Sequence, residues 1–226
     1  MPESRAILLD IEGTTTPVAF VYEVLFPYAR KHLEDFVRAH AREESLEADL
    51  AKLRAEQASD PEQHAESPVE YLLWLMDRDR KSTALKSIQG KIWEEGYRSG
   101  SLQGLVYDDV PRAFARWSRQ GKRIAIFSSG SVLAQKLLFG HTTDGDLTSY
   151  LGGYFDTTVG PKREAESYVK IARSLNLPIR EMLFVSDVVP ELEGAKAAGM
   201  STALCVRIPS QTSAAWSPTI NSFDEL

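Results

Sequence analysis

The sequence contains a single cysteine, Cys205, and this scarcity limits both covalent cross-linking and cellular location. One cysteine cannot form a disulfide within the chain, so the fold must be stabilised by its core. Cys205 lies in an apolar run, where we expect an inert buried thiol. Because chains without disulfides are typical of reducing compartments, we expect a cytoplasmic protein.

Long apolar runs are also absent. No stretch approaches the roughly 20 apolar residues that span a bilayer, and the first ten residues lack the apolar core of a secretion signal. We therefore expect a chain that is not inserted in a membrane and has no membrane partner.

Positive charge is in deficit, with 26 Lys and Arg against 32 Asp and Glu and a formal net charge of −6. This balance argues against a general surface for nucleic acid or anionic lipid. Binding of phosphate would then depend on a few locally placed cations or on a metal. We expect a small-molecule partner, no nucleic acid, and a chain that acts as a monomer.

The pattern of predicted elements changes along the chain. Residues 17–103 are typical of helices and loops, whereas strands and helices alternate from residue 104 onward. We predict an α/β fold with a doubly wound parallel sheet, formed by residues 1–16 and 104–226. An all-helical cap, residues 17–103, is predicted to be inserted after the first strand. Residues 207–226 are predicted to form a tail that packs loosely.

The stretch 6–16, Ala-Ile-Leu-Leu-Asp-Ile-Glu-Gly-Thr-Thr-Thr, predicts a short buried strand followed by a polar turn. Asp10 ends this strand, and Glu12 adds a second carboxylate from the turn. Two acids and a run of hydroxyls suit a phosphate held through Mg²⁺, which prefers oxygen ligands. The alternative is a solvated strand end with a helix cap.

Polar groups also follow three other predicted strands. In a parallel sheet the carboxyl ends of the strands share one edge, where open α/β sheets bind ligands. The four groups are Asp10 with Glu12, Ser128 with Ser129 after a strand at 123–127, Lys162 after a short strand at 154–159, and Asp187 after a strand at 182–186.

Each of the later groups has a structural alternative. Ser128 and Ser129 can bind an anion at a helix start or simply cap that helix. Lys162 is predicted to lie at the start of a helix, where a cation is unfavourable unless an anion is close. Asp187 can cap a helix, although Glu191 four residues later could direct a second carboxylate at the same cation.

Taken together, Asp10-Ile-Glu-Gly-Thr, Ile-Phe-Ser128-Ser129-Gly, Gly-Pro-Lys162 and Val-Ser-Asp187 resemble the four motifs of the haloacid-dehalogenase superfamily, in order and across the chain. Most phosphatases of that superfamily have Asp where this chain has Glu12. A longer stretch, Leu-Leu-Asp-Ile-Glu-Gly-Thr-Thr-Thr-Pro followed by Val-Ala-Phe-Val, is similar to the enolase-phosphatases of methionine salvage, which have Glu there.

The resemblance implies a bifunctional hydrolase. Such an enzyme enolises 2,3-diketo-5-methylthiopentyl-1-phosphate and then removes phosphate to give the acireductone 1,2-dihydroxy-3-keto-5-methylthiopentene. It implies Asp10 as the nucleophile, through an aspartyl-phosphate, and Glu12 as a proton donor and acceptor. One Mg²⁺ per chain would be held by Asp10, Glu12 and Asp187, and the substrate phosphate by Ser128, Ser129 and Lys162.

Two other functions remain open from the sequence. Another capped Mg²⁺-dependent small-molecule phosphatase or phosphomutase of the superfamily would share every core motif. A signalling module with a stable phosphoaspartate at Asp10 is disfavoured by the long helical insertion.

Overall fold

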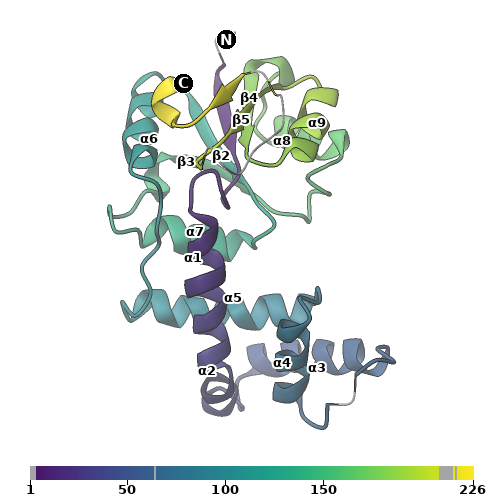
Figure 1. Cartoon of the computed structure of the whole chain (residues 1–226). Helices are drawn as coiled ribbons and strands as arrows, with labels where there is room; N and C mark the ends of the chain where they lie inside the picture. Colours follow the sequence, from purple (N-terminus) through teal and green to yellow (C-terminus); the bar gives the residue numbers. More distant parts are fainter. Residues whose placement is uncertain (1–3, 64, 209–215, 217) are drawn as a thin grey trace. The chain divides into compact units, whose positions relative to one another are not determined.

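The computed structural model describes residues 4–63, 65–208, 216 and 218–226 (Figure 1). The chain divides into two compact units. The first, here called the α/β unit, comprises Met1–Phe20 and Gln103–Leu226, and the second, the helical unit, comprises Val21–Leu102. The predicted insertion, residues 17–103, starts before the helical unit and ends just after it.

A parallel sheet of six strands forms the centre of the α/β unit, in the order β3-β2-β1-β4-β5-β6. The strands are β1 (Ala6–Leu9), β2 (Arg123–Phe127), β3 (Leu151–Phe155), β4 (Met182–Ser186), β5 (Ser201–Cys205) and β6 (Thr219–Ile220). The central strands are buried on both faces, which explains their continuous apolar sequences. This topology confirms the predicted fold class.

Helices cover both faces of the sheet (Figure 1). On one face, α8 (Ala165–Ser174) and α9 (Val189–Ala197) pack against alternate strand residues such as Leu8, Phe127 and Phe184. The other face carries α6 (Asp109–Arg119) and α7 (Val132–Gly140), whose aromatic side chains meet where Phe114 contacts Phe139. Short helices complete the unit: α1 (Val18–Phe20), η2 (Thr148–Tyr150), η3 (Ile179–Glu181) and η5 (Phe223–Glu225).

The helical unit has its own buried apolar core. Its elements are the π-helix η1 (Val21–Leu25), α2 (Phe26–Ala39), α3 (Glu44–Ala58), α4 (Pro68–Asp77) and α5 (Thr83–Arg98). Residues such as Leu33, Leu72 and Ile88 are almost fully buried. A reciprocal capping box between Ser67 and Glu70 starts α4. None of the helices described in either unit has the length and apolar character needed to cross a membrane.

Three local predictions were wrong in detail. The strand predicted at 154–159 ends at Phe155, because the Asp156 side chain accepts a hydrogen bond from the Thr158 N–H and closes a turn. Helix α8 begins at Ala165, so Lys162 lies in the loop before the helix instead of at its start.

The segment predicted to be a loose tail is instead partly built into the core. Thr219–Ile220 add β6 to the sheet, and Phe223 is fully buried with its ring centroid 5.4 Å from that of Trp117. Residues 209–215 and 217 of the same prediction lie outside the described part of the chain.

Candidate active site

The candidate site lies where the carboxyl ends of the central strands meet. Leu9 of β1 is level with Ile126 of β2 and with Val185 of β4. Asp10 therefore emerges beside Asp187, which directly follows β4. The chain order of the sheet reverses between β1 and β4, and open α/β sheets bind their ligands at such a point.

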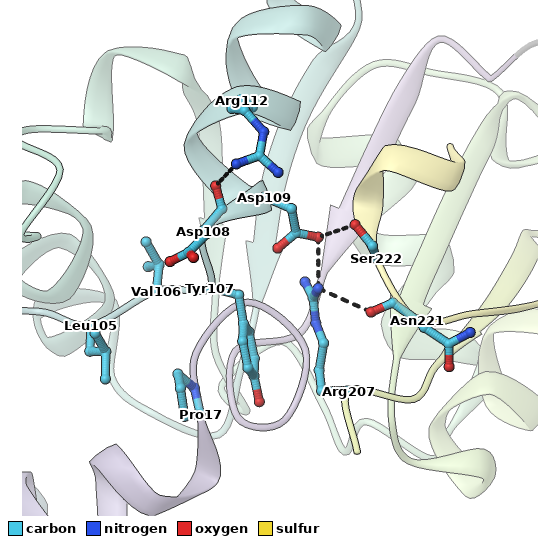
Figure 2. A pocket seen from close by; sticks show the side chains of 10 residues that line it. All are labelled: Pro17, Leu105, Val106, Tyr107, Asp108, Asp109, Arg112, Arg207, Asn221 and Ser222. Atoms are coloured by element: carbon cyan, nitrogen blue, oxygen red, sulfur yellow. Dashed lines mark hydrogen bonds and ion pairs between the residues drawn. The ribbon is translucent and has the colours of Figure 1, made fainter. Parts of the chain in front are cut away.

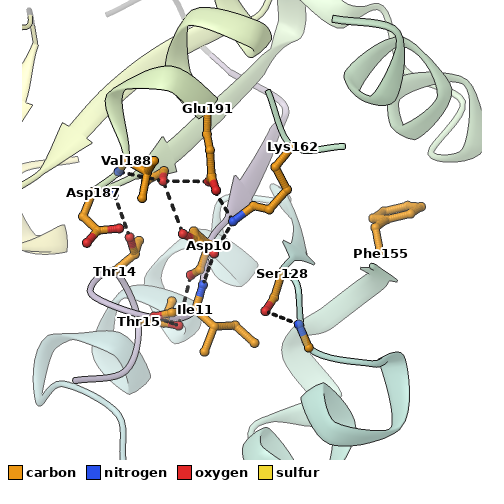
Figure 3. Close-up of polar contacts among 12 residues, drawn as sticks. Asp10, Ile11, Thr14, Thr15, Ser128, Phe155, Lys162, Asp187, Val188 and Glu191 are labelled. Carbon is orange, nitrogen blue, oxygen red and sulfur yellow. Dashed lines mark hydrogen bonds and ion pairs between the residues drawn. The ribbon is translucent and has the colours of Figure 1, made fainter. Parts of the chain in front are cut away.

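Asp10 and Lys162, which lie far apart in the sequence, form a buried ion pair (Figure 3). The Lys162 Nζ is 2.6 Å from the Asp10 Oδ1, and only 3% of Asp10 is exposed. The Ile11 N–H donates to the same oxygen at 2.7 Å. Ser186 Oγ lies 3.3 Å from the Asp10 Oδ2. The carboxylate is thus held in one orientation by groups on both of its oxygens.

Lys162 also pairs with Glu191, whose Oε2 is 2.7 Å from Nζ. Burial alone would lower the pKa of Lys162, but the carboxylates of Asp10 and Glu191 outweigh that effect and raise it. The ammonium therefore stays charged. Glu191 does not join Asp187 in the structure as its spacing suggested, because it turns to Lys162 and Ser186.

The loop that carries Lys162 is fixed by contacts with its neighbours. The buried Tyr168 hydroxyl lies 2.6 Å from the Lys162 carbonyl and 3.0 Å from the Glu191 carbonyl. Gly160 has a φ of +143°, a conformation that favours glycine. Helix α9 approaches the loop so closely that a Cβ at Gly194 would lie 2.6 Å from the Arg163 carbonyl oxygen.

Asp187 is placed against the turn that follows β1. Its backbone N–H donates to the Thr14 Oγ1 at 3.1 Å. Gly13 has a φ of +73°, and a Cβ there would overlap the Asp187 carboxylate. The Asp187 Oδ1 is buried and has no hydrogen-bond partner among the described residues. A buried carboxylate oxygen without a partner is unfavourable unless a ligand such as a cation satisfies it.

Glu12 lies in the same negative field. Burial and the charges of Asp10 and Asp187 raise its pKa to about 7, although Lys162 opposes the shift. Burial and Asp10 likewise raise the pKa of Asp187 to about 6. Together with Glu191, these carboxylates greatly outnumber the single ammonium of Lys162. Such an excess of negative charge in a partly buried site favours the binding of a cation.

The donors available for a cation are oxygens. Within the described part of the chain, no group of three or more His, Cys, Asp or Glu side chains is arranged to hold a metal ion. The predicted ligands Asp10, Glu12 and Asp187 are therefore not a complete set of side chains. This is compatible with Mg²⁺, which usually retains several waters and uses one or two carboxylates.

The two predicted serines follow β2. Ser128 is buried, and its Oγ accepts a hydrogen bond from the Gly130 N–H at 3.0 Å, while Ser129 is exposed. The hydrogen bonds described for Ser128 stay within its own loop and β3, and none of them reaches Asp10. Its side chain nevertheless emerges at the same edge of the sheet (Figure 3).

Sequence reasoning missed two supporting side chains. Ser186 bridges Asp10 and Glu191, but as the last residue of a predicted strand it gave no sign of that role. Gln135 is buried in α7 and donates to the carbonyls of Gly130 and Phe155 at 3.0 and 2.8 Å. The sequence alone does not indicate this role for Gln135, because it depends on where the loop after β2 and the end of β3 lie.

Comparison with known proteins agrees with this geometry. Residues 4–199 match the family model of the haloacid dehalogenase-like hydrolases. The enolase-phosphatase E1 of Synechococcus elongatus is 53% identical over 97% of this chain and 96% of its own. The enolase-phosphatase E1 of Azotobacter vinelandii is 48% identical over 97% of this chain and 95% of its own.

Solved structures are similar over the same extent. The UTR4 protein of Saccharomyces cerevisiae is 34% identical, with a TM-score of 0.82 over 99% of this chain and 100% of its own. CbbY of Rhodobacter sphaeroides, solved in complex with xylulose-(1,5)-bisphosphate, is 18% identical with a TM-score of 0.60 over 99% of this chain and 96% of its own, which supports the fold alone. By sequence and fold, the chain belongs to the haloacid dehalogenase-like hydrolases and, among them, to the enolase-phosphatase E1 family.

Proposed function

We propose that this chain converts 2,3-diketo-5-methylthiopentyl-1-phosphate, through its enol, into 1,2-dihydroxy-3-keto-5-methylthiopentene and phosphate in methionine salvage. The observation that carries the hydrolytic half is the buried Asp10–Lys162 pair beside the unpartnered Asp187 oxygen. The substrate rests on the close similarity to the enolase-phosphatases E1.

Asp10 is the proposed nucleophile. One of its carboxylate oxygens forms a bond to phosphorus while the bond from phosphorus to the substrate oxygen breaks, giving an aspartyl-phosphate. Lys162 holds the attacking carboxylate and neutralises charge on the phosphoryl group. Water then attacks phosphorus, and the Asp10 carboxylate is released with inorganic phosphate.

Glu12 is the proposed proton carrier for both halves of the hydrolysis. Burial and the charges of Asp10 and Asp187 raise the pKa of Glu12 to about 7 without a metal ion, so that both protonation states lie within reach near neutral pH. The protonated acid gives its proton to the leaving oxygen, and the resulting carboxylate takes a proton from the attacking water. Ser128 and Ser129 are proposed to donate hydrogen bonds to the phosphate from the end of β2.

We propose that one Mg²⁺ per chain is held by Asp10, Glu12 and Asp187. The unpartnered Asp187 Oδ1 and the excess of carboxylates fit such a cation. When bound, Mg²⁺ would neutralise the phosphoryl oxygens and polarise the adjacent ketone for enolisation. We further propose that the helical unit is the cap, and that the protein acts as a cytoplasmic monomer without a nucleic-acid partner.

The proposal is tested by following both products of the reaction with the Asp10→Asn variant. Asparagine keeps nearly the same shape but is a far poorer nucleophile, so phosphate release should fall to background. Enolisation needs a base and a polarised ketone rather than a nucleophile at phosphorus, so the enol phosphate should accumulate. The experiment records ultraviolet absorbance of the enol and free phosphate in the same sample with Mg²⁺.

The wild-type chain supplies the control, since it should form enol and phosphate in sequence and lose phosphate release in chelator. Undiminished phosphate release by Asp10→Asn would remove Asp10 from the role of nucleophile. If the wild-type chain instead hydrolyses other phosphorylated metabolites and leaves the diketo phosphate unchanged, the alternative of a different small-molecule phosphatase is correct.

A further inference from the structure

Arg207, just after β5, is buried against the turn that follows β1. Its Nε and one terminal nitrogen donate to the Thr14 carbonyl at 2.9 and 2.7 Å. The other terminal nitrogen is 2.6 Å from the Asp109 Oδ2. The guanidinium lies 4.3 Å from the ring centroid of Tyr107 and 4.5 Å from that of Phe223. All three nitrogens of the guanidinium therefore donate to groups within the protein.

This arrangement is rigid for physical reasons. Only 6% of the Arg207 side chain and 7% of the Asp109 side chain are exposed, so the pair is weakly screened by water. A planar guanidinium can grip one carbonyl with two N–H groups and stack between two rings at the same time, which an ammonium cannot. Figure 2 shows Arg207 extended beside Tyr107 with its end directed at Asp109.

The Thr14 carbonyl that Arg207 binds belongs to the turn that follows β1 and Asp10. The hydroxyl of the same residue, Thr14, accepts the Asp187 N–H, and the preceding Gly13 lies directly against the Asp187 carboxylate. The next carbonyl, that of Thr15, accepts a hydrogen bond from the Tyr107 N–H at 3.0 Å, and the Thr15 hydroxyl donates to the Asp10 carbonyl at 3.1 Å. A shift of Thr14 would therefore move the surroundings of both Asp10 and Asp187.

The C-terminal segment completes the same cluster. The Asp109 Oδ2 also accepts the Phe223 N–H at 2.5 Å and the Ser222 hydroxyl at 3.0 Å. Asp109 thus joins Arg207 to residues 222 and 223, which are far from the phosphate-binding motifs in sequence. The contacts connect the end of the chain to the turn that carries Asp10 and Glu12.

We propose that Arg207 is a positioning residue for phosphoryl transfer. By holding the Thr14 carbonyl, it fixes the turn that follows the Asp10 nucleophile and lies against Asp187. This role rests on the proposed phosphatase function, but it concerns the hydrolytic core alone and does not depend on the identity of the substrate. Arg207 itself does not touch the substrate.

The test compares Arg207→Met with Arg116→Met. Arg116 is the control, because it donates to backbone carbonyls of the C-terminal segment, those of Phe223 and Leu226, and none of its described hydrogen bonds reaches the turn. Turnover is measured with a generic aryl phosphate, at a temperature well below the lowest unfolding midpoint among the wild type and the variants. Misplacing reacting groups by about 1 Å can cost on the order of 10²-fold, so kcat should fall about 10- to 100-fold for Arg207→Met with a much smaller change in KM. Arg116→Met should retain wild-type kcat.

A second measurement is independent of catalysis. Mg²⁺ added to the chelated protein should raise the unfolding midpoint less for Arg207→Met than for wild type or Arg116→Met, because the turn that follows Asp10 and lies against Asp187 is no longer held. Arg207→Lys, which keeps the charge and at least one donor, should recover part of both effects. If Arg207→Met fails to fold, Arg207→Lys against Arg116→Lys gives the same comparison.

The results separate this proposal from the assigned substrate. Equal kcat values and equal Mg²⁺ shifts in the Arg207 and Arg116 variants would overturn the positioning role. A wild-type chain that is active on the aryl phosphate but inert to the diketo phosphate would overturn the assigned substrate and leave the role of Arg207 intact.

Discussion

At the scale of single residues, the site is governed by an excess of carboxylates around one ammonium. Lys162 contacts both Asp10 and Glu191, while Asp187 has a buried oxygen without a partner. Burying several carboxylates around one ammonium lowers the free energy of unfolding unless a cation or another ligand binds to them. The charge therefore explains both the raised pKa values and the fit to a cation bound together with a phosphate.

Lys162→Met should lower turnover on the order of 10²-fold, because it removes a preorganised positive charge from the phosphoryl group. Methionine keeps most of the side-chain volume, so packing against Phe127, whose ring centroid is 5.8 Å from Nζ, is largely retained. The neighbouring Arg163 is exposed and provides the control. Arg163→Met should change kcat less than about threefold by the same criterion, and equally small effects from both variants would argue that Lys162 has no catalytic part.

At the scale of elements, the site depends on how closely helix α9 approaches the Lys162 loop. Gly194 faces the Arg163 backbone, which cannot move aside as a flexible side chain would. The close approach of α9 at Gly194 therefore restricts the position of the loop that carries Lys162.

Gly194→Ala should destabilise the fold by about 1–3 kcal/mol, the usual cost of overpacking, and should also lower kcat by displacing the loop. Gly140, at the end of α7, is the matched control, because a Cβ there would make only ordinary contact with Thr148 Cγ2 at 3.6 Å. Thermal unfolding and aryl phosphate turnover measure the two effects. A Gly194→Ala protein as stable and as active as Gly140→Ala would show that the close approach is not needed.

Much of this element order could be predicted from the sequence, because apolar runs and turn residues are local signals. The strands 123–127 and 182–186 occur as predicted. Local patterns could not show that Ile220 pairs with β5 or that Phe223 packs on Trp117, since both contacts join distant segments. The sequence predicts a helix start at Lys162, whereas α8 begins at Ala165 and Lys162 lies in the loop before it.

The sequence could predict that several polar strand ends share one edge of the sheet, but it could not predict which of their side chains pair with one another. Strand ends placed Asp10, Ser128 and Asp187 at one edge, as the sheet register now explains. Spacing favoured a joint role for Asp187 and Glu191, whereas the structure pairs Glu191 with Lys162. Side-chain direction across a loop and a helix is decided by tertiary contacts such as those of Tyr168, and sequence spacing does not contain that information.

At the scale of the whole molecule, the acidic site is embedded in an acidic chain, with a formal net charge of −6. The net charge of the chain therefore does not offset the repulsion within the site. Protons and divalent cations should therefore compete for the same carboxylates, and their binding should appear in the stability of the folded protein.

The folded-state pKa values of about 7 for Glu12 and about 6 for Asp187 lie above their ordinary values of 4.5 and 3.8. Between those limits the folded protein holds more protons than the unfolded chain, so the free energy of unfolding must fall as pH rises. The unfolding midpoint of chelated protein should therefore decline from about pH 5 to about pH 7.5. Added Mg²⁺ should stabilise most at the upper end of this range, where the carboxylates are ionised. Asp187→Asn should flatten the decline and weaken the response to Mg²⁺. The difference between this variant and the wild type separates the contribution of the site from that of other groups such as His40, whose pKa is also raised. A midpoint that stays level or rises with pH in chelator would contradict the proposed crowding of carboxylates.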